Sequence, residues 1–339
     1  MQLLQPGDHT MRSLVEVFGL EGVPLRLTQI SRGGHGQVWR LDLDRPRQSY
    51  AVKELFAGGE EQQVVAEVEF RDLAVAAGIR AAETLRTVDG RYLAEVGGTV
   101  VRVSTWAGGR EPRPDDPGVP EWLGRTLATL HTLGHPVDPD HAPADPPVPD
   151  LATWLDLAEQ GKTAGQPWAT NLAHAAPDLA KLAAKTRPVG PDHLVFSHHD
   201  VQPCNVVFDP DNEQFVLLDW DGAGPIDPAR ELASRLYTWH AGDDGRFDTD
   251  GARRTLRAYR AAGGLAVIGE AEAYGGIPDA LANIEGQALA SLNEALPAEM
   301  REHATREIGL LVGPPPPEET TGSTPYDIFE AIIELSRTL

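Results

Sequence analysis

The stretch from Val195 to Asp227 constrains the fold of this chain more than any other part of its sequence. It reads VFSHHDVQPCNVVFDPDNEQFVLLDWDGAGPID. Apolar runs at 206–208 and 215–218 flank the turn-forming segment 209–212, so the pattern predicts a β-hairpin. Three polar residues are then expected at neighbouring strand ends: Asp200, Asn205 and Asp219.

Three oxygen-bearing side chains at the mouth of a hairpin suit a hard divalent cation. Magnesium binds few protein oxygens and keeps its other positions for water and phosphate. The spacing from His198 through Asp200 to Asn205 allows one loop to carry both a proton acceptor and a metal ligand. The alternative interpretation is a polar hairpin whose Asp and Asn side chains only form turns.

The same residues carry a family resemblance. The segment HHDVQPCN at 198–205, followed by LDWD at 218–221, resembles the catalytic and metal-binding motifs of the aminoglycoside phosphotransferases. Choline kinases and other small-molecule kinases with the protein-kinase-like fold share this pattern. The later segment GAGPIDP at 222–228 is similar to the glycine and Asp-Pro segment of the family.

The resemblance implies a role for each polar residue. Asp200 would accept or orient the proton of a substrate hydroxyl, while Asn205 and Asp219 would hold the Mg²⁺ that bridges the nucleotide phosphates. His198 would brace the loop. Asp221 is a supporting residue that shares a face with Asp219 if the strand continues, but points elsewhere if a turn follows.

Asp227 is interpreted as a structural supporting residue, because Asp-Pro is typical of a helix N-cap followed by the first helical position. The sequence departs from the family at His199 and Cys204, where many members carry glycine, and at Arg230-Glu231, where many carry Asp-Leu. These departures remove no expected catalytic group, so they affect the substrate class more than the chemistry.

A glycine-rich segment, SRGGHGQ at 31–37, lies between two strand-like runs. A turn of this kind lets the backbone approach phosphate closely, because glycine has no side chain in the way. Gly33, Gly34 and Gly36 are therefore candidates for nucleotide binding. The turn alone is weak support, because Trp39 stands where the kinase pattern G-x-G-x-x-G has its third glycine.

The following strand strengthens the nucleotide hypothesis. SYAVKEL at 49–55 resembles the V-A-I-K strand of kinases, which implies that Lys53 contacts the nucleotide phosphates and pairs with a glutamate on the next helix. That helix is predicted at 60–77. Glu67 is the favoured partner and Glu69 the second choice.

The resemblance implies an α+β, bilobal protein-kinase-like fold. The expected parts are a nucleotide-binding lobe at 1–104, a hinge at 105–111, and a helical C-terminal lobe at 112–339. The N-terminal lobe would hold a small antiparallel sheet and one helix. The C-terminal lobe would carry the catalytic hairpin at 195–221 and the helices that bind the acceptor.

Local patterns predict the remaining elements. Asp89-Gly90 is a strong hairpin signal between candidate strands at 84–87 and 91–94, and 100–104 is the last strand of the sheet. Helical periodicity and stop signals predict the helices. They are expected at 11–18, 121–133, 151–160, 171–185, 229–240, 250–262, 277–296, 298–311 and 327–339.

Composition limits the partners and the compartment. The single cysteine among 339 residues excludes an intramolecular disulfide and favours a reducing compartment. An apolar run long enough for a membrane span is not seen, so a cytoplasmic protein is expected. The net charge of −22 argues against nucleic acid and would attract a cationic substrate. For the charge taken alone, an acidic surface that only keeps the protein soluble is the favoured interpretation.

The function predicted from these features is Mg²⁺-dependent transfer of the γ-phosphoryl group of ATP or GTP to a hydroxyl of a small cationic acceptor. An aminoglycoside-type antibiotic, as in resistance enzymes, is the favoured acceptor. Alternatives are a metabolic kinase for choline, an amino sugar or another small alcohol, and a nucleotide-binding sensor without transfer activity. The sequence leaves open a monomer or a homodimer.

Overall fold

The computed structural model describes residues 3–33, 36–113, 116–137, 145–187, 193–242, 245–313 and 324–339. The chain divides into two compact units. The first comprises Met1–Trp122, Thr129–His135 and Phe196–Gly224, and the second comprises Leu123–Ala128, Pro136–Val195 and Pro225–Leu339. The first unit therefore combines the N-terminal strands with the stretch that carries Asp200, Asn205 and Asp219.

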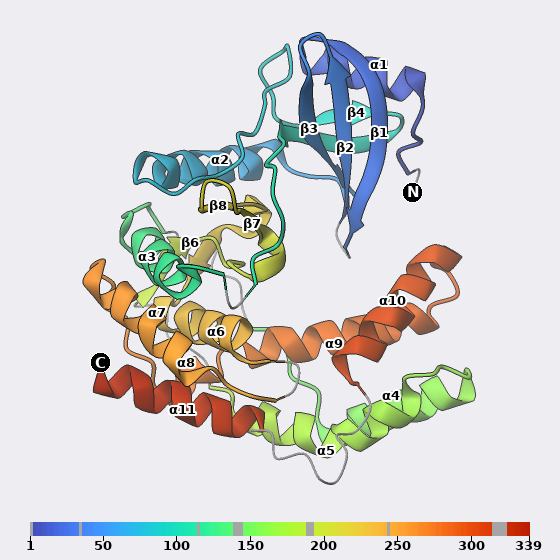
Figure 1. The fold of residues 1–339 in the computed structure, drawn as a ribbon. Helices are drawn as coiled ribbons and strands as arrows, with labels where there is room; N and C mark the ends of the chain where they lie inside the picture. The colour runs from blue at the N-terminus through green and yellow to red at the C-terminus, as the bar shows by residue number, and fades with distance from the viewer. Residues whose placement is uncertain are drawn as a thin grey trace. The chain divides into compact units, whose positions relative to one another are not determined.

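A five-stranded antiparallel sheet forms the N-terminal part of the first unit (Figure 1). Its strand order is β1-β2-β3-β5-β4. The strands are β1 (Val23–Arg32), β2 (Gly36–Asp44), β3 (Gln48–Leu55), β4 (Ala94–Val96) and β5 (Thr99–Thr105). Two helices accompany them, α1 (Asp8–Val17) and α2 (Glu61–Ala76). The predicted sheet and the predicted helix after Lys53 are confirmed.

Strand alternation gives the sheet two different faces. Leu41, Val52 and Val103 are fully buried in one core with Leu14 of α1. Their neighbours along the strands point to the opposite face, because successive side chains alternate. Lys53 therefore lies on the face away from α1.

The prediction of a β-hairpin across Asp89-Gly90 is wrong. A turn forms there, but the flanking residues are not strands. The N–H groups of Tyr92 and Leu93 donate to the Glu61 carboxylate at 2.6 and 3.0 Å, which takes them away from a strand ladder. The chain turns instead at Gly97-Gly98, between β4 and β5, where both residues have positive φ.

The hairpin predicted from the apolar runs at 206–208 and 215–218 is present as β7 (Val206–Asp209) and β8 (Gln214–Leu217), which pair antiparallel with Val206 opposite Leu217. Phe208 and Phe215 stack with ring centroids 4.7 Å apart. Short elements surround the hairpin. They are β6 (Val195–Ser197), β9 (Gly224–Ile226) and the 3₁₀ turns η3 (Pro203–Asn205) and η4 (Trp220–Gly222).

Helices dominate the second unit. Trp154, Trp168 and Leu281 are buried in a core shared by α4, α5, α9 and α10. The helices of the remaining chain are α3 (Val119–Thr132), α4 (Leu151–Thr163), α5 (Ala169–Lys185), α6 (Pro228–His240), α7 (Thr249–Ala261), α8 (Glu270–Ala273), α9 (Ile277–Leu292), α10 (Ala298–Leu311) and α11 (Pro325–Thr338). The predicted helices are confirmed within a few residues, and α8 was not predicted. Within the described ranges, no helix has both the length and the apolar character needed to cross a bilayer.

Glu54 is a fully buried carboxylate on the core face of β3. It accepts hydrogen bonds from the Leu4 N–H at 2.7 Å, Gln37 Nε2 at 2.5 Å and Trp39 Nε1 at 3.2 Å. Glu54→Gln presents an amide donor to these donors, so we expect the free energy of unfolding to fall by about 2–3 kcal/mol. Urea denaturation measures this loss. Glu95→Gln, at an exposed position of β4, is the matched control, and equal effects of both variants would contradict the prediction.

His240 is a buried histidine of α6, and its burial predicts that acid destabilises the second unit. Burial lowers the pKa of His240 to about 4, and the nearby Arg254 adds to the shift while Asp248 opposes it. The pKa of His240 in the folded protein lies below the ordinary value of 6.5. The contribution of the neutral ring to the free energy of unfolding is therefore fully present above pH 6.5 and is lost as the pH falls from 6.5 toward 4.

Between pH 6.5 and pH 4, we therefore expect the free energy of unfolding of the His240→Gln variant to fall by about 3 kcal/mol less than that of the wild type. This is the free energy that corresponds to lowering the His240 pKa from 6.5 to about 4. Unfolding free energies measured across this pH range test the prediction. His9→Gln, at an exposed site, should keep the wild-type slope. A His240→Gln slope equal to that of the wild type would show that His240 is not the group responsible.

Candidate active site

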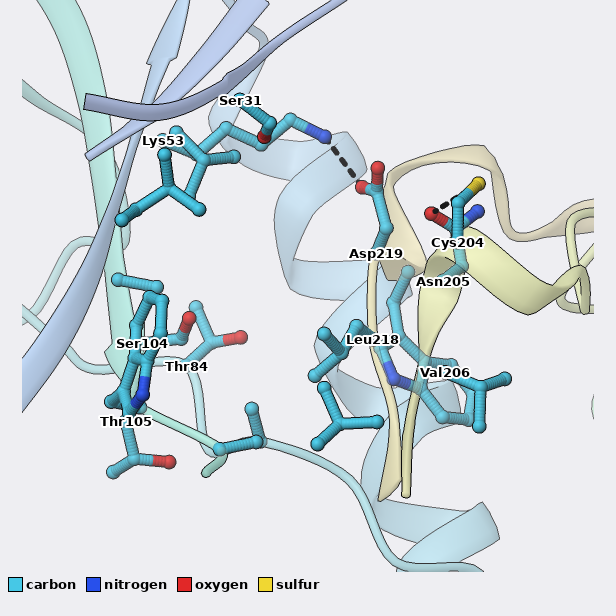
Figure 2. A pocket seen from close by; sticks show the side chains of 18 of the residues that line it. Ser31, Lys53, Thr84, Ser104, Thr105, Cys204, Asn205, Val206, Leu218 and Asp219 are labelled. Atoms are coloured by element: carbon cyan, nitrogen blue, oxygen red, sulfur yellow. Dashed lines mark hydrogen bonds and ion pairs between the residues drawn. The ribbon is translucent and has the colours of Figure 1, made fainter. Parts of the chain in front are cut away.

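A cavity of about 390 Å³ lies within the first unit (Figure 2). Its walls come from the face of the sheet opposite α1, from α2, from residues 104–111 and from the hairpin region. Four of the predicted site residues line it together. They are Lys53, Glu67, Asn205 and Asp219.

Lys53 is held by two carboxylates. Its Nζ lies 2.5 Å from Asp219 Oδ1 and 2.8 Å from Asp221 Oδ2. Figure 2 shows Lys53 and Asp219 pointing toward one another, with Asn205 close to Asp219. Two segments that are far apart in the sequence, β3 and the residues after β8, are therefore joined by ion pairs.

Glu67 forms its ion pair with Arg102. Arg102 Nη1 lies 3.0 Å from Glu67 Oε2, and its Nη2 contacts Asp221 Oδ1. Glu67 still raises the pKa of Lys53 through its charge, so its predicted partnership with Lys53 is electrostatic. Sequence reasoning missed Arg102, although a charged residue that alternates with buried Val101 and Val103 was a visible signal.

Burial and charge shift the pKa values of this cluster in opposite directions. Burial lowers the pKa of Lys53, and the neighbouring Asp219 only partly offsets this effect. Burial also acts to raise the pKa of Asp219, but the adjacent Lys53 ammonium outweighs it and the pKa lies below its usual value. Burial raises the pKa of Glu67 against the influence of Arg102.

His198 connects the loop to the hairpin. It is fully buried; its Nε2 lies 2.9 Å from the Leu218 carbonyl, and its Nδ1 accepts from the Asp200 N–H at 3.2 Å. These partners define a neutral ring with the proton on Nε2. The predicted bracing geometry is thus present, since one ring fixes the backbone of Asp200 and that of the residue before Asp219.

Asp200 and Asn205 contact one another directly. Asn205 Nδ2 donates to Asp200 Oδ2 at 2.6 Å and to the Asp200 carbonyl at 3.1 Å, while Gln202 Nε2 donates to Oδ2 at 2.9 Å. The Leu218 N–H donates to the Asn205 carbonyl at 2.8 Å. This bond extends the β7–β8 ladder by one step and brings Asn205 beside Asp219.

Asp219 itself has a left-handed backbone, with φ 57° and ψ 66°. The chain then enters η4, so the turn that the sequence left open does occur. Asp221 nevertheless reaches the same ion cluster as Asp219, through its contacts with Lys53 and Arg102.

In the glycine-rich turn, the close approach of β3 explains the glycine at position 36. The Gly33 N–H donates to the Gly36 carbonyl at 2.8 Å, and a Cβ on Gly36 would lie 2.3 Å from the Glu54 carbonyl. Gly36 is therefore required by the close approach of β3. Gly34 lies outside the described residues, and Gly33 and Gly36 are not among the residues that line the cavity.

Asp227 and Cys204 lie outside the ion cluster. Asp227 is confirmed as the N-cap of α6, because its carboxylate accepts from the N–H groups of Ala229 and Arg230 at 2.9 Å each. Cys204 has an exposed side-chain surface, but the surrounding protein partly desolvates its thiol, and this desolvation together with the charge of Asp200 raises the pKa of the thiol to about 11. A thiol with this pKa is a poor nucleophile at neutral pH.

His199 occupies a position where the sequence comparison expects glycine, and its φ is +66°. A side chain there costs about 1–2 kcal/mol, whereas glycine adopts this conformation freely. We expect His199→Gly to be more stable than His199→Ala by about 1 kcal/mol, since both variants lose the ring and only alanine keeps the strain. Chemical denaturation of the two variants measures the difference; an alanine variant of equal or greater stability would contradict it.

Among the described residues, no group of three His, Cys, Asp or Glu side chains is arranged to hold a metal ion. Two oxygen donors of the cavity wall, the Asp219 carboxylate and the Asn205 amide, lie beside one another at the end of the hairpin. The Asn205 nitrogen is turned toward Asp200, so its oxygen, which the Cys204 thiol contacts at 3.8 Å, is the atom that would face a cation. Hard oxygen donors of this kind, few in number, fit Mg²⁺ together with phosphate and water.

Comparison with known proteins identifies the class to which the chain belongs. Residues 26–265 match the family described as the phosphotransferase enzyme family. Because the match covers more than half of the sequence, the chain belongs to this family of phosphotransferases. No curated protein sequence matches the chain.

Solved structures confirm the predicted α+β kinase-like fold. A spectinomycin phosphotransferase in complex with ADP and spectinomycin has a TM-score of 0.66 at 14% identity, with 100% of both chains covered. An amicoumacin kinase in complex with AMP-PNP, Ca²⁺ and Ami has a TM-score of 0.56 at 17% identity, covering 94% of this chain and 95% of that one. A microcompartment-associated aminopropanol kinase has a TM-score of 0.55 at 16% identity, covering 89% and 94%.

Proposed function

We propose that this phosphotransferase transfers the γ-phosphoryl group of ATP or GTP to a hydroxyl of a small acceptor, with Mg²⁺ as cofactor. The observation that carries the proposal is the linked arrangement of Lys53, Asp219, Asn205 and Asp200. An ion pair joins the first two, a backbone hydrogen bond sets Asn205 beside Asp219, and a 2.6 Å hydrogen bond joins Asn205 to Asp200.

The cavity is assigned to the nucleotide. Lys53 would bind the phosphates, since a buried ammonium needs anions near it. Hydroxyls from Thr84, Ser104 and Thr105 lie at the other end of the cavity (Figure 2), where the base would lie against residues 105–111. The division into a lobe at 1–104, a hinge and a C-terminal lobe is part of this proposal.

Asn205 and Asp219 would hold the magnesium ion. When bound, Mg²⁺ neutralises charge on the phosphate oxygens and orients the γ-phosphoryl group. The contribution of the protein is to fix the two oxygen donors. The backbone bond between Asn205 and Leu218, the residue before Asp219, performs this function.

Asp200 would orient the acceptor hydroxyl and take its proton. The hydroxyl oxygen forms a bond to the γ-phosphorus, the bond from phosphorus to the bridging oxygen breaks, and the nucleoside diphosphate leaves with that electron pair. The amides of Asn205 and Gln202 hold Oδ2 of Asp200 and so fix the direction of the carboxylate. Positioning of this kind supplies much of the rate in phosphoryl transfer.

A cationic acceptor fits the net charge of −22, because a protein of this charge attracts cations over the Debye length. We favour an aminoglycoside-type antibiotic. The spectinomycin and amicoumacin enzymes of similar fold support an antibiotic, whereas the aminopropanol kinase supports the alternative of a small metabolic amino alcohol. Choline and amino sugars belong to the same test panel.

Asp200→Asn should lower kcat by about a thousandfold while it changes the nucleotide Kd less than threefold, because the substitution removes the proton acceptor and keeps the shape. Release of nucleoside diphosphate is measured with Mg²⁺ and ATP or GTP across the panel of acceptors. Asp211→Asn is the matched control, since Asp211 is exposed in the turn between β7 and β8.

Two outcomes would contradict the proposal. If the wild type binds nucleotide but no acceptor of the panel stimulates release, the sensor alternative is favoured. If Asp200→Asn keeps the wild-type kcat, Asp200 has no role in the transfer.

A further inference from the structure

Arg102 is a second cation on the wall of the nucleotide cavity. It lies directly opposite Lys53 in the β3–β5 pairing, so both side chains leave the same face of the sheet. Both residues line the cavity. The Arg102 side chain is only 12% exposed, and such a buried guanidinium requires anionic partners.

The partners of Arg102 come from two different elements. Nη1 binds Glu67 of α2, and Nη2 binds Asp221 in η4. The planar fork of arginine can bind two carboxylates at once, whereas a lysine ammonium is a single point of charge. Arg102 therefore connects α2 to the segment that follows Asp219.

The charge of the cluster shows why a second cation is needed. Lys53 and Arg102 are the two cations, and they face three carboxylates. Glu67 has a side chain only 5% exposed, and Asp221 is 27% exposed. Without Arg102, these two carboxylates would be left with Lys53 as their nearest cation, and Asp221 already lies 2.8 Å from it.

Nucleotide phosphates must compete with carboxylates for Lys53. We propose that Arg102 is a positioning residue that neutralises Glu67 and Asp221, and so keeps Lys53 available to the nucleotide phosphates. The inference rests on the proposed function, since it requires that a nucleotide binds in this cavity.

The first test is the Kd of the Mg²⁺–ATP complex, measured by isothermal titration calorimetry and compared with kcat and KM. Arg102→Met should raise the Kd and the KM for ATP about tenfold and change kcat less than threefold, because Lys53 is drawn to the unpaired carboxylates. Arg102→Lys should give an intermediate rise of about threefold, because it restores one charge without the fork.

Arg26→Met is the matched control. It removes another arginine of the same sheet, whose Nη2 pairs with Asp42 at 3.0 Å and which does not line the cavity. Its Kd should equal that of the wild type. Thermal unfolding of all variants separates a loss of stability from a loss of nucleotide binding.

A double variant identifies the mechanism. If Arg102 acts by neutralising Asp221, then Asp221→Asn in the Arg102→Met background should recover most of the lost affinity. An unchanged Kd in Arg102→Met, or independent losses that simply multiply in the double variant, would overturn the inference.

If Arg102→Met does not fold, a wild-type Kd in Arg102→Lys would overturn the inference equally. A wild type that binds no nucleotide under any of these conditions would instead refute the proposed function. The two failures are therefore distinguishable.

Discussion

The ion pair between Lys53 and Asp219 joins the two halves of the proposed active site. The lysine comes from the sheet and the aspartate from the end of the hairpin, 166 residues later in the chain. Burial acts against the charged form of Lys53, and opposite charges nearby compensate for the lost solvation. A nucleotide bound in the cavity would meet a lysine already surrounded by acids, and its phosphates would have to replace them.

The arrangement of the loop follows from backbone contacts more than from side chains. His198 accepts from one backbone N–H and donates to one carbonyl, and so links the turn at Asp200 to Leu218. The strained, left-handed residues His199 and Asp219 occur next to these contacts. Strain of this kind persists where neighbouring structure fixes the backbone, as is common at functional sites.

The wrong and incomplete predictions share one physical cause. The Asp89-Gly90 signal is local and did produce a turn, but the Glu61 carboxylate from a distant helix took the N–H groups that a strand would need. Arg102 was likewise visible as a charged residue in a strand. Its partners lie on other elements, and pairing between elements depends on the tertiary fold rather than on local spacing.

The sequence by itself determined the type of most elements, the hairpin that carries Asn205 and Asp219, and the family. These features depend on periodicity, turn residues and short motif spacing, which are properties of neighbouring residues. Only the tertiary structure decided that Glu67 binds Arg102, that Asp221 joins Lys53 despite the turn after Asp219, and that Gly36 is required by the β3 backbone. Each of these contacts joins two different elements, so its geometry exists only once those elements have packed together.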